Sequence, residues 1–126
     1  MLSGLFSKKE TEPTNWAEVT NDAQLEELHQ KSFEEPVMLF KHSTRCAISS
    51  MALDRFERNY KSDGGFKPYF LDLISYRDIS NKVADKYGIM HQSPQVILIH
   101  NGDAVYDESH TGIMFEEISK KSKEIA

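Results

Sequence analysis

Residues 36–56 read PVMLFKHSTRCAISSMALDRF, and they predict a strand followed directly by a helix. The apolar run 37–40 follows a proline and is too short for a helix, so it is typical of a strand buried on both faces. A helix is expected from about residue 46 to 60. The only cysteine of the chain, Cys46, stands at the junction between the two elements.

The expected helix has an apolar stripe. Ile48, Ala52 and Phe56 recur every four residues, and Met51 and Leu53 widen the stripe. This pattern predicts that all five side chains face the protein core.

The flanking sequence continues the alternation of strands and helices. Their expected order is β-α-β-α-β-α-β-β-α, which indicates an α/β fold with a central mixed sheet flanked by helices. The other predicted elements are a strand within 15–20, a helix from Asn21, a strand at 67–74, a helix after Ser75, strands at 96–99 and 104–106, and a final helix at 111–123.

Four local signals support these boundaries. Asn21 and Gln24 resemble a capping box, and Ser75 with Asp78 can cap the following helix. A glycine at position 88 favours the end of that helix, because glycine accepts positive φ. The pair Asn101-Gly102 favours a type I′ hairpin turn for the same reason.

Length and composition restrict the classes of protein. The 126 residues fit one domain, expected at 15–126 after a mobile tail at 1–14. A net charge of −5 argues against nucleic acids and anionic membranes as partners. One cysteine permits no internal disulfide, and without an export signal we expect a cytoplasmic protein, as a monomer.

Cys46 is predicted to lie at the N-terminus of its helix. Unpaired backbone N–H groups and the helix dipole provide positive potential there, and Arg45 is the preceding residue. Such surroundings favour the thiolate, which is the form that attacks disulfides. The alternative is a cysteine that serves only as a small buried apolar residue.

Ser49 follows Cys46 with the spacing of the second cysteine in a C-x-x-C redox motif. A hydroxyl cannot resolve a mixed disulfide, but it can donate a hydrogen bond to a thiolate one turn back. We therefore expect Arg45 and Ser49 to stabilise the thiolate and an outside thiol to regenerate Cys46. The alternative is an ordinary exposed helical serine.

The order of elements, the cysteine after the second strand and SPQVILI at 93–99 resemble the thioredoxin fold. This resemblance implies that Pro94 is a cis-proline facing Cys46 and that the backbone of Ser93 pairs with substrate. A trans-proline that merely begins a strand is the alternative. Asp72 could match the buried aspartate under the thioredoxin site, or it could take an edge position.

FKHSTRCAISS, together with Trp16 and SPQVILI, resembles more narrowly the monothiol bacilliredoxins, over about residues 15–120. Their T-x-C-x-I-S pattern is met by Thr44, Cys46, Ile48 and Ser49. Ala47 departs from relatives that carry proline at that position. The resemblance implies a general stress protein of the bacillithiol redox system.

The implied activity is a thiol–disulfide exchange at Cys46 that removes a small thiol, expected to be bacillithiol, from protein mixed disulfides. The small thiol is a co-substrate, and neither a permanent cofactor nor a metal is expected. Bacillithiol carries two carboxylates, which suggests anion contacts. The residues expected to bind substrate are Lys41, His42, Thr44, Ser93, Pro94 and Thr111.

Two other functions stay open from the sequence. The first is a thioredoxin-like stress or binding module that forms no productive mixed disulfide. The second is an iron–sulfur carrier, although Ala47 and Ile48 replace the glycine and phenylalanine of the usual C-G-F-S motif.

Overall fold

A computed structural model describes residues 12–126, so that residues 1–11 of the expected tail at 1–14 lie outside the described part. The predicted order of strands and helices is confirmed. The elements are β1 (Ala17–Glu18), α2 (Asp22–Lys31), β2 (Val37–His42), α3 (Ala47–Asn59), β3 (Lys67–Asp72), α4 (Arg77–Tyr87), β4 (Gln95–His100), β5 (Asp103–Ser109), the 3₁₀ turn η1 (His110–Gly112) and α5 (Phe115–Ile125).

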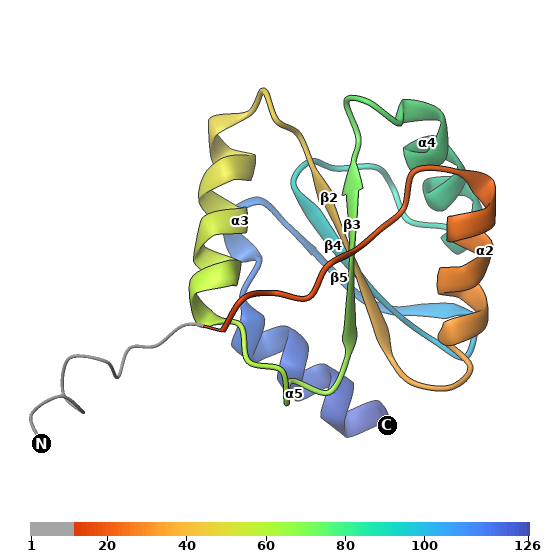
Figure 1. Ribbon diagram of the computed structural model, residues 1–126, viewed down its shortest axis with the longest axis vertical. Helices are drawn as coiled ribbons and strands as arrows, with labels where there is room; N and C mark the ends of the chain where they lie inside the picture. Colours follow the sequence, from red (N-terminus) through yellow and green to blue (C-terminus); the bar gives the residue numbers. More distant parts are fainter. Residues whose placement is uncertain (1–11) are drawn as a thin grey trace, which may run out of the picture.

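The strands form one mixed sheet in the order β1-β3-β2-β4-β5. β1, β3 and β2 run parallel to one another. β4 pairs antiparallel with β2 on one side and with β5 on the other. α3 and α5 cover one face of the sheet, and α2 and α4 cover the other (Figure 1). Because α3 and α4 follow the parallel strands β2 and β3, both helices begin at the same edge of the sheet, the one formed by the carboxyl ends of these strands (Figure 1).

β2 is buried along its whole length, as its apolar run predicts. Its side chains alternate between two cores. Val37 and Leu39 join the core under α2 and α4, and Met38 and Phe40 join the core under α3 and α5. The two polar residues that end the strand continue this alternation and therefore point to opposite faces.

Several predicted turns and caps are confirmed. Gln24 N–H donates to Asn21 Oδ1 at 2.9 Å and caps α2. Gly88 ends α4 with a positive φ of 65°. Asn101 and Gly102 have φ values of 53° and 81°, as a type I′ turn requires.

The predicted cap of α4 is wrong. The N-cap residue is Tyr76, which makes no side-chain capping hydrogen bond. The Ser75 hydroxyl donates instead to Asp72 Oδ2 at 3.0 Å, so that Ser75 belongs to the turn that leaves β3.

The last helix begins at Phe115, later than predicted. Two long-range contacts hold the segment before it outside the helix. His110 N–H donates to the Pro94 carbonyl at 3.0 Å, and Arg55 Nη2 donates to the carbonyls of Thr111 and Ile113 at 3.3 and 2.9 Å. These partners are distant in sequence, and a local pattern does not report them.

The apolar stripe of α3 is only partly correct. Ser49, Ala52 and Phe56 are the buried residues of the helix, whereas Ile48 and Met51 are 49% and 66% exposed. The buried face is rotated by about one residue from the predicted one, and a serine takes the place expected for an apolar side chain. Within residues 12–126, no helix is long and apolar enough to cross a membrane.

Candidate active site

Cys46 is the N-cap residue of α3, with extended backbone angles and no side-chain capping hydrogen bond. The residue is partly exposed to solvent, and its thiol is free. The backbone is fixed on both sides, because Cys46 N–H donates to the Ser43 carbonyl at 3.2 Å and Ser50 N–H donates to the Cys46 carbonyl at 3.0 Å. The first turn of α3 contains no acidic residue that would oppose a thiolate.

A buried hydrogen-bond cluster supports the loop that carries this thiol. Ser43 N–H donates to Ser49 Oγ at 3.0 Å, and Ser49 Oγ lies 2.7 Å from His42 Nδ1. All three residues are buried, and Ser49 is 0% exposed. This His42–Ser49–Ser43 cluster joins the end of β2 to the first turn of α3.

The structure therefore places Ser49 differently from the expectation that its hydroxyl donates to Cys46. The hydroxyl oxygen accepts from the Ser43 backbone amide, and the hydroxyl shares its second hydrogen bond with Nδ1 of the imidazole. Among residues 12–126, no hydrogen bond between Ser49 and Cys46 is formed. Ser49 supports the thiol through the loop.

His42 lies beside two aromatic rings. The centroid of its ring is 6.5 Å from that of Phe40 and 5.6 Å from that of Phe70. Burial lowers the pKa of His42 below its usual range, and the negative charges of Asp72 and Glu57 oppose this effect. The neutral imidazole is thus favoured, and its Nδ1 shares a hydrogen bond with the Ser49 hydroxyl.

Asp72 does not lie buried beneath the thiol. It ends β3 opposite His42, is partly exposed, and accepts hydrogen bonds from the amides of Ile74 and Ser75 at 3.1 and 3.3 Å. Neither expected position for Asp72 is found, because it is the last residue of β3, an inner strand of the sheet, and it pairs in regular register with His42.

The Ser93–Pro94 peptide bond is cis, as the fold resemblance implies. The pairing of Lys41 with Gln95 brings this bond beside the end of β2, four residues before Cys46. Pro94 is buried, and Ser93 is partly buried with a hydroxyl that has no hydrogen-bond partner.

A small hollow lies between α3 and η1, and sequence patterns alone did not indicate it. Arg55 connects the two sides of the hollow, because its guanidinium donates hydrogen bonds to the backbone carbonyls of Thr111 and Ile113. The hollow is lined by Ile48, Met51, Ala52, Arg55, His110 and Thr111. The exposed side chains of Ile48 and Met51 thus line this hollow near the N-terminus of α3, where Cys46 lies.

Lys41 and His42 do not meet at one anion site. As consecutive strand residues, they point to opposite faces, and only His42 faces α3. Lys41 is 0% exposed, and its Nζ has no hydrogen-bond partner. Burial, and then the charge of Arg77, lower the pKa of Lys41 to about 8. By contrast, Thr44, Arg45 and Thr111 are exposed at the surface.

The sequence model of the family described as Monothiol bacilliredoxin BrxC matches residues 17–118, which include the thiol loop and the cis-proline. The chain belongs to the monothiol bacilliredoxin family. Family and fold together support a thiol redox function for this bacilliredoxin.

Solved structures agree with this fold. One, described as an oxidoreductase with a thioredoxin fold, is 26% identical with a TM-score of 0.73, and the match covers 86% of this bacilliredoxin and 93% of that chain. Thioredoxin from Trypanosoma brucei brucei is 13% identical, with a TM-score of 0.70 and coverage of 92% and 95%. Mitochondrial thioredoxin 3 from Saccharomyces cerevisiae is 14% identical, with a TM-score of 0.66 and coverage of 88% and 96%.

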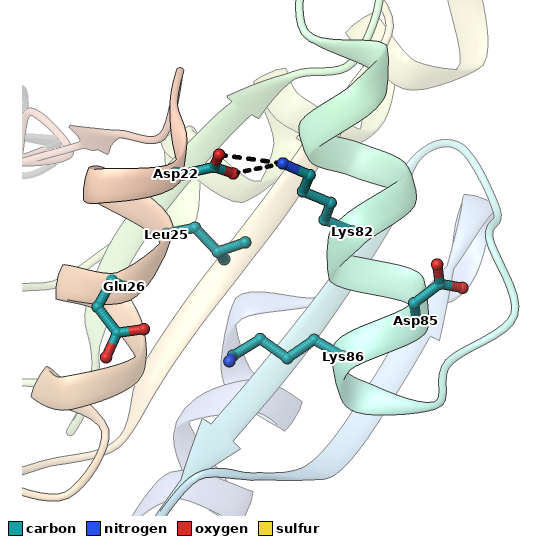
Figure 2. Close-up of a pocket in the computed structure, with 6 residues that line it drawn as sticks. All are labelled: Asp22, Leu25, Glu26, Lys82, Asp85 and Lys86. Atoms are coloured by element: carbon teal, nitrogen blue, oxygen red, sulfur yellow. Dashed lines mark hydrogen bonds and ion pairs between the residues drawn. The ribbon is translucent and has the colours of Figure 1, made fainter.

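A second hollow of this bacilliredoxin lies between α2 and α4, away from the thiol (Figure 2). Lys82 spans it and binds both carboxylate oxygens of Asp22 at 2.8 and 3.0 Å. Glu26 and Lys86 extend into the same gap from the two helices (Figure 2). Its charges are of both signs and exposed, and no nucleophile lines it. Within residues 12–126, no group of three or more metal-ligating side chains gathers.

Proposed function

We propose that this bacilliredoxin is a monothiol thiol–disulfide oxidoreductase that removes a small thiol, bacillithiol, from protein mixed disulfides through Cys46. The observation that carries the proposal is the position of the partly exposed Cys46 at the N-terminus of α3, at the edge of the sheet where the cis Ser93–Pro94 bond precedes β4. The family match supports the same chemistry.

The proposed reaction has two exchange steps. The Cys46 thiolate attacks the bacillithiol sulfur of the mixed disulfide, an S–S bond to Cys46 forms, and the client sulfur leaves as a thiolate that takes a proton from water. A second bacillithiol thiolate then attacks the bacillithiol sulfur on Cys46. Bacillithiol disulfide forms, and Cys46 returns as a thiolate. The net exchange releases the client thiol and oxidises one free bacillithiol, which leaves bound to the bacillithiol removed from the client.

The neighbouring residues have distinct proposed roles. Arg45 and the first-turn amides of α3 attract the thiolate, and Ser49 holds the thiol loop in place. The backbone of Ser93 and Pro94 holds the client segment extended, and Thr44 and Thr111 border it as exposed polar residues. We also propose a monomer that works in the cytoplasm, because small-thiol exchange requires a reducing compartment.

The test uses a client protein whose single cysteine carries bacillithiol. Release of the client thiol is followed by intact-mass spectrometry under non-reducing conditions. We expect catalytic release by the wild type with excess bacillithiol, a transient bacillithiol adduct on Cys46, and no release above background by Cys46→Ser. Equal release by the wild type and Cys46→Ser would reject the proposal in favour of a non-catalytic module.

A further inference from the structure

Three basic residues gather at the edge of the sheet where the thiol lies, but on the side of α4. Lys41 is buried on β2 without a partner, Arg77 is the first residue of α4, and His91 follows α4 in the loop before Pro94. The pKa of His91 is lowered by partial desolvation of its ring and by the positive charges of Lys41 and Arg77. The strand register brings the three residues to one place. Lys41 pairs with Gln95, whose side-chain amide donates to the Met90 carbonyl at 3.0 Å next to His91. Lys41 also pairs with Leu71, near the end of the strand that leads into α4 and Arg77.

No carboxylate compensates this positive charge within the part of the chain that the structure describes. Neither Lys41, Arg77 nor His91 forms a salt bridge there. Asp78, in the first turn of α4, is exposed and acts on Lys82 instead. A buried ammonium without a counter-charge costs several kcal/mol, and an anion bound nearby would offset part of this cost.

The helix end beside this cluster also lacks a partner. Tyr76, the N-cap of α4, makes no side-chain capping hydrogen bond. The Ser80 amide donates to the Tyr76 carbonyl, which leaves the amides of residues 77–79 of this 11-residue helix available to an anion. The buried hydroxyl of Ser93 has no partner either, and Ser93 is next to the cis-proline.

We propose that Lys41, Arg77, His91 and the first turn of α4 form an anion site that binds a carboxylate of the small thiol exchanged at Cys46. Arg77 and His91 are exposed and contact the carboxylate directly, whereas Lys41 attracts it from beneath. The identity of the ligand rests on the proposed function. The site shares the edge of the sheet with Cys46 because α3 and α4 both begin there (Figure 1).

The first experiment measures binding without any thiol chemistry. Malate, which has the two carboxylates but no sulfur, is titrated into the full chain labelled with ¹⁵N, and amide shifts are recorded. We expect saturable shifts at residues 77–80. In Arg77→Gln the affinity for malate should fall about tenfold, because one charge-assisted hydrogen bond is lost. Lys86→Gln, which removes one positive charge from the last turn of the same helix, should match the wild type.

An inorganic phosphate titration separates the two sources of such an anion. If phosphate saturates the same amides and malate at equal concentration does not displace it, the carboxylate assignment is overturned. Equal malate affinity in the wild type and Arg77→Gln, or shifts confined to other segments, would overturn the site itself.

The second experiment compares bacillithiol with its analogue that lacks the malate group, each as the reductant of the Cys46 mixed disulfide. Arg77→Gln should lower the rate about tenfold with bacillithiol and less than about twofold with the analogue. Equal losses with both thiols would contradict a carboxylate contact. If the wild type reacts with neither thiol, the proposed function fails, and the malate titration still decides whether the anion site exists.

Discussion

His42 Nδ1 and Ser49 Oγ lie 2.7 Å apart in a buried contact between the end of β2 and the first turn of α3. The Ser49 oxygen also accepts the Ser43 amide at 3.0 Å, so that one hydroxyl connects His42 and Ser43 at the end of β2 to α3. The serine of the C-x-x-S motif is therefore a structural part of the thiol loop, and the following predictions start from this contact.

Ser49→Ala should destabilise the fold and disturb the thiol loop. The variant leaves the buried Ser43 amide and His42 Nδ1 without a partner, which costs about 1–3 kcal/mol of unfolding free energy. Urea unfolding followed by the fluorescence of Trp16, which packs against Phe56, measures the loss. Ser50→Ala, at an exposed position of the same helix, should change it by less than about 0.5 kcal/mol. Equal effects of the two variants would show that the cluster contributes nothing.

Stability should fall at mildly acidic pH because of His42. Burial lowers the pKa of His42 in the folded state, so between that pKa and about 6.5 the unfolded chain binds the extra proton. The unfolding free energy is therefore complete above about pH 6.5 and decreases as the pH falls toward the folded pKa, by at most about 1.4 kcal/mol per pH unit. In His42→Gln, whose side chain does not titrate, the slope should be smaller, as urea unfolding at several pH values would show. A slope unchanged by the substitution would contradict the assignment.

Lys41→Met should stabilise the protein at neutral pH. Lys41 is buried without a partner, and its pKa of about 8 lies below the unfolded value, so folding at pH 7 bears the cost of an unpaired ammonium, a few kcal/mol. Between about pH 8 and 9.5 the wild type should gain stability with rising pH, because only the unfolded chain keeps the proton, whereas Lys41→Met should not.

The control for Lys41→Met is Lys120→Met at an exposed position of α5. It should leave both the stability at pH 7 and the alkaline slope unchanged. Thermal and urea unfolding of the three proteins provide the comparison, and a destabilised Lys41→Met with an intact alkaline slope would refute the prediction.

Arg55→Gln should loosen the segment that borders the small hollow. The guanidinium is the side chain that holds the carbonyls of Thr111 and Ile113. We expect faster amide hydrogen exchange across residues 110–114 and release of the client thiol slowed about threefold to tenfold, equivalent to one hydrogen bond of about 1 kcal/mol. Arg58→Gln, whose parent side chain forms an exposed pair with Asp54, should alter neither quantity.

The order of strands and helices could be predicted from the sequence because each element has a strong local signal. The apolar run at 37–40 and the Asn101-Gly102 turn are examples in which the local sequence indicates the conformation. The position of Cys46 at a helix N-terminus follows from the same signals, since it depends only on where β2 ends and α3 begins.

The surroundings of the thiol could not be predicted in the same way, because they depend on which face of each element is covered. A helical period does not distinguish the buried Ser49 from the exposed Ile48 beside it. The contact of Arg55 with Thr111 joins residues 56 positions apart. The burial of Lys41 likewise depends on α4 and on the loop that follows it, which no pattern within β2 records.

The outer strands of the sheet limit its association with other chains. β1 is two residues long, and β5 places Asp103 and Asp107 at exposed positions. A short edge offers few free backbone groups to a foreign strand, and charged side chains make the other edge a poor template for aggregation. Neither outer strand of the described sheet therefore favours the addition of a strand from another chain.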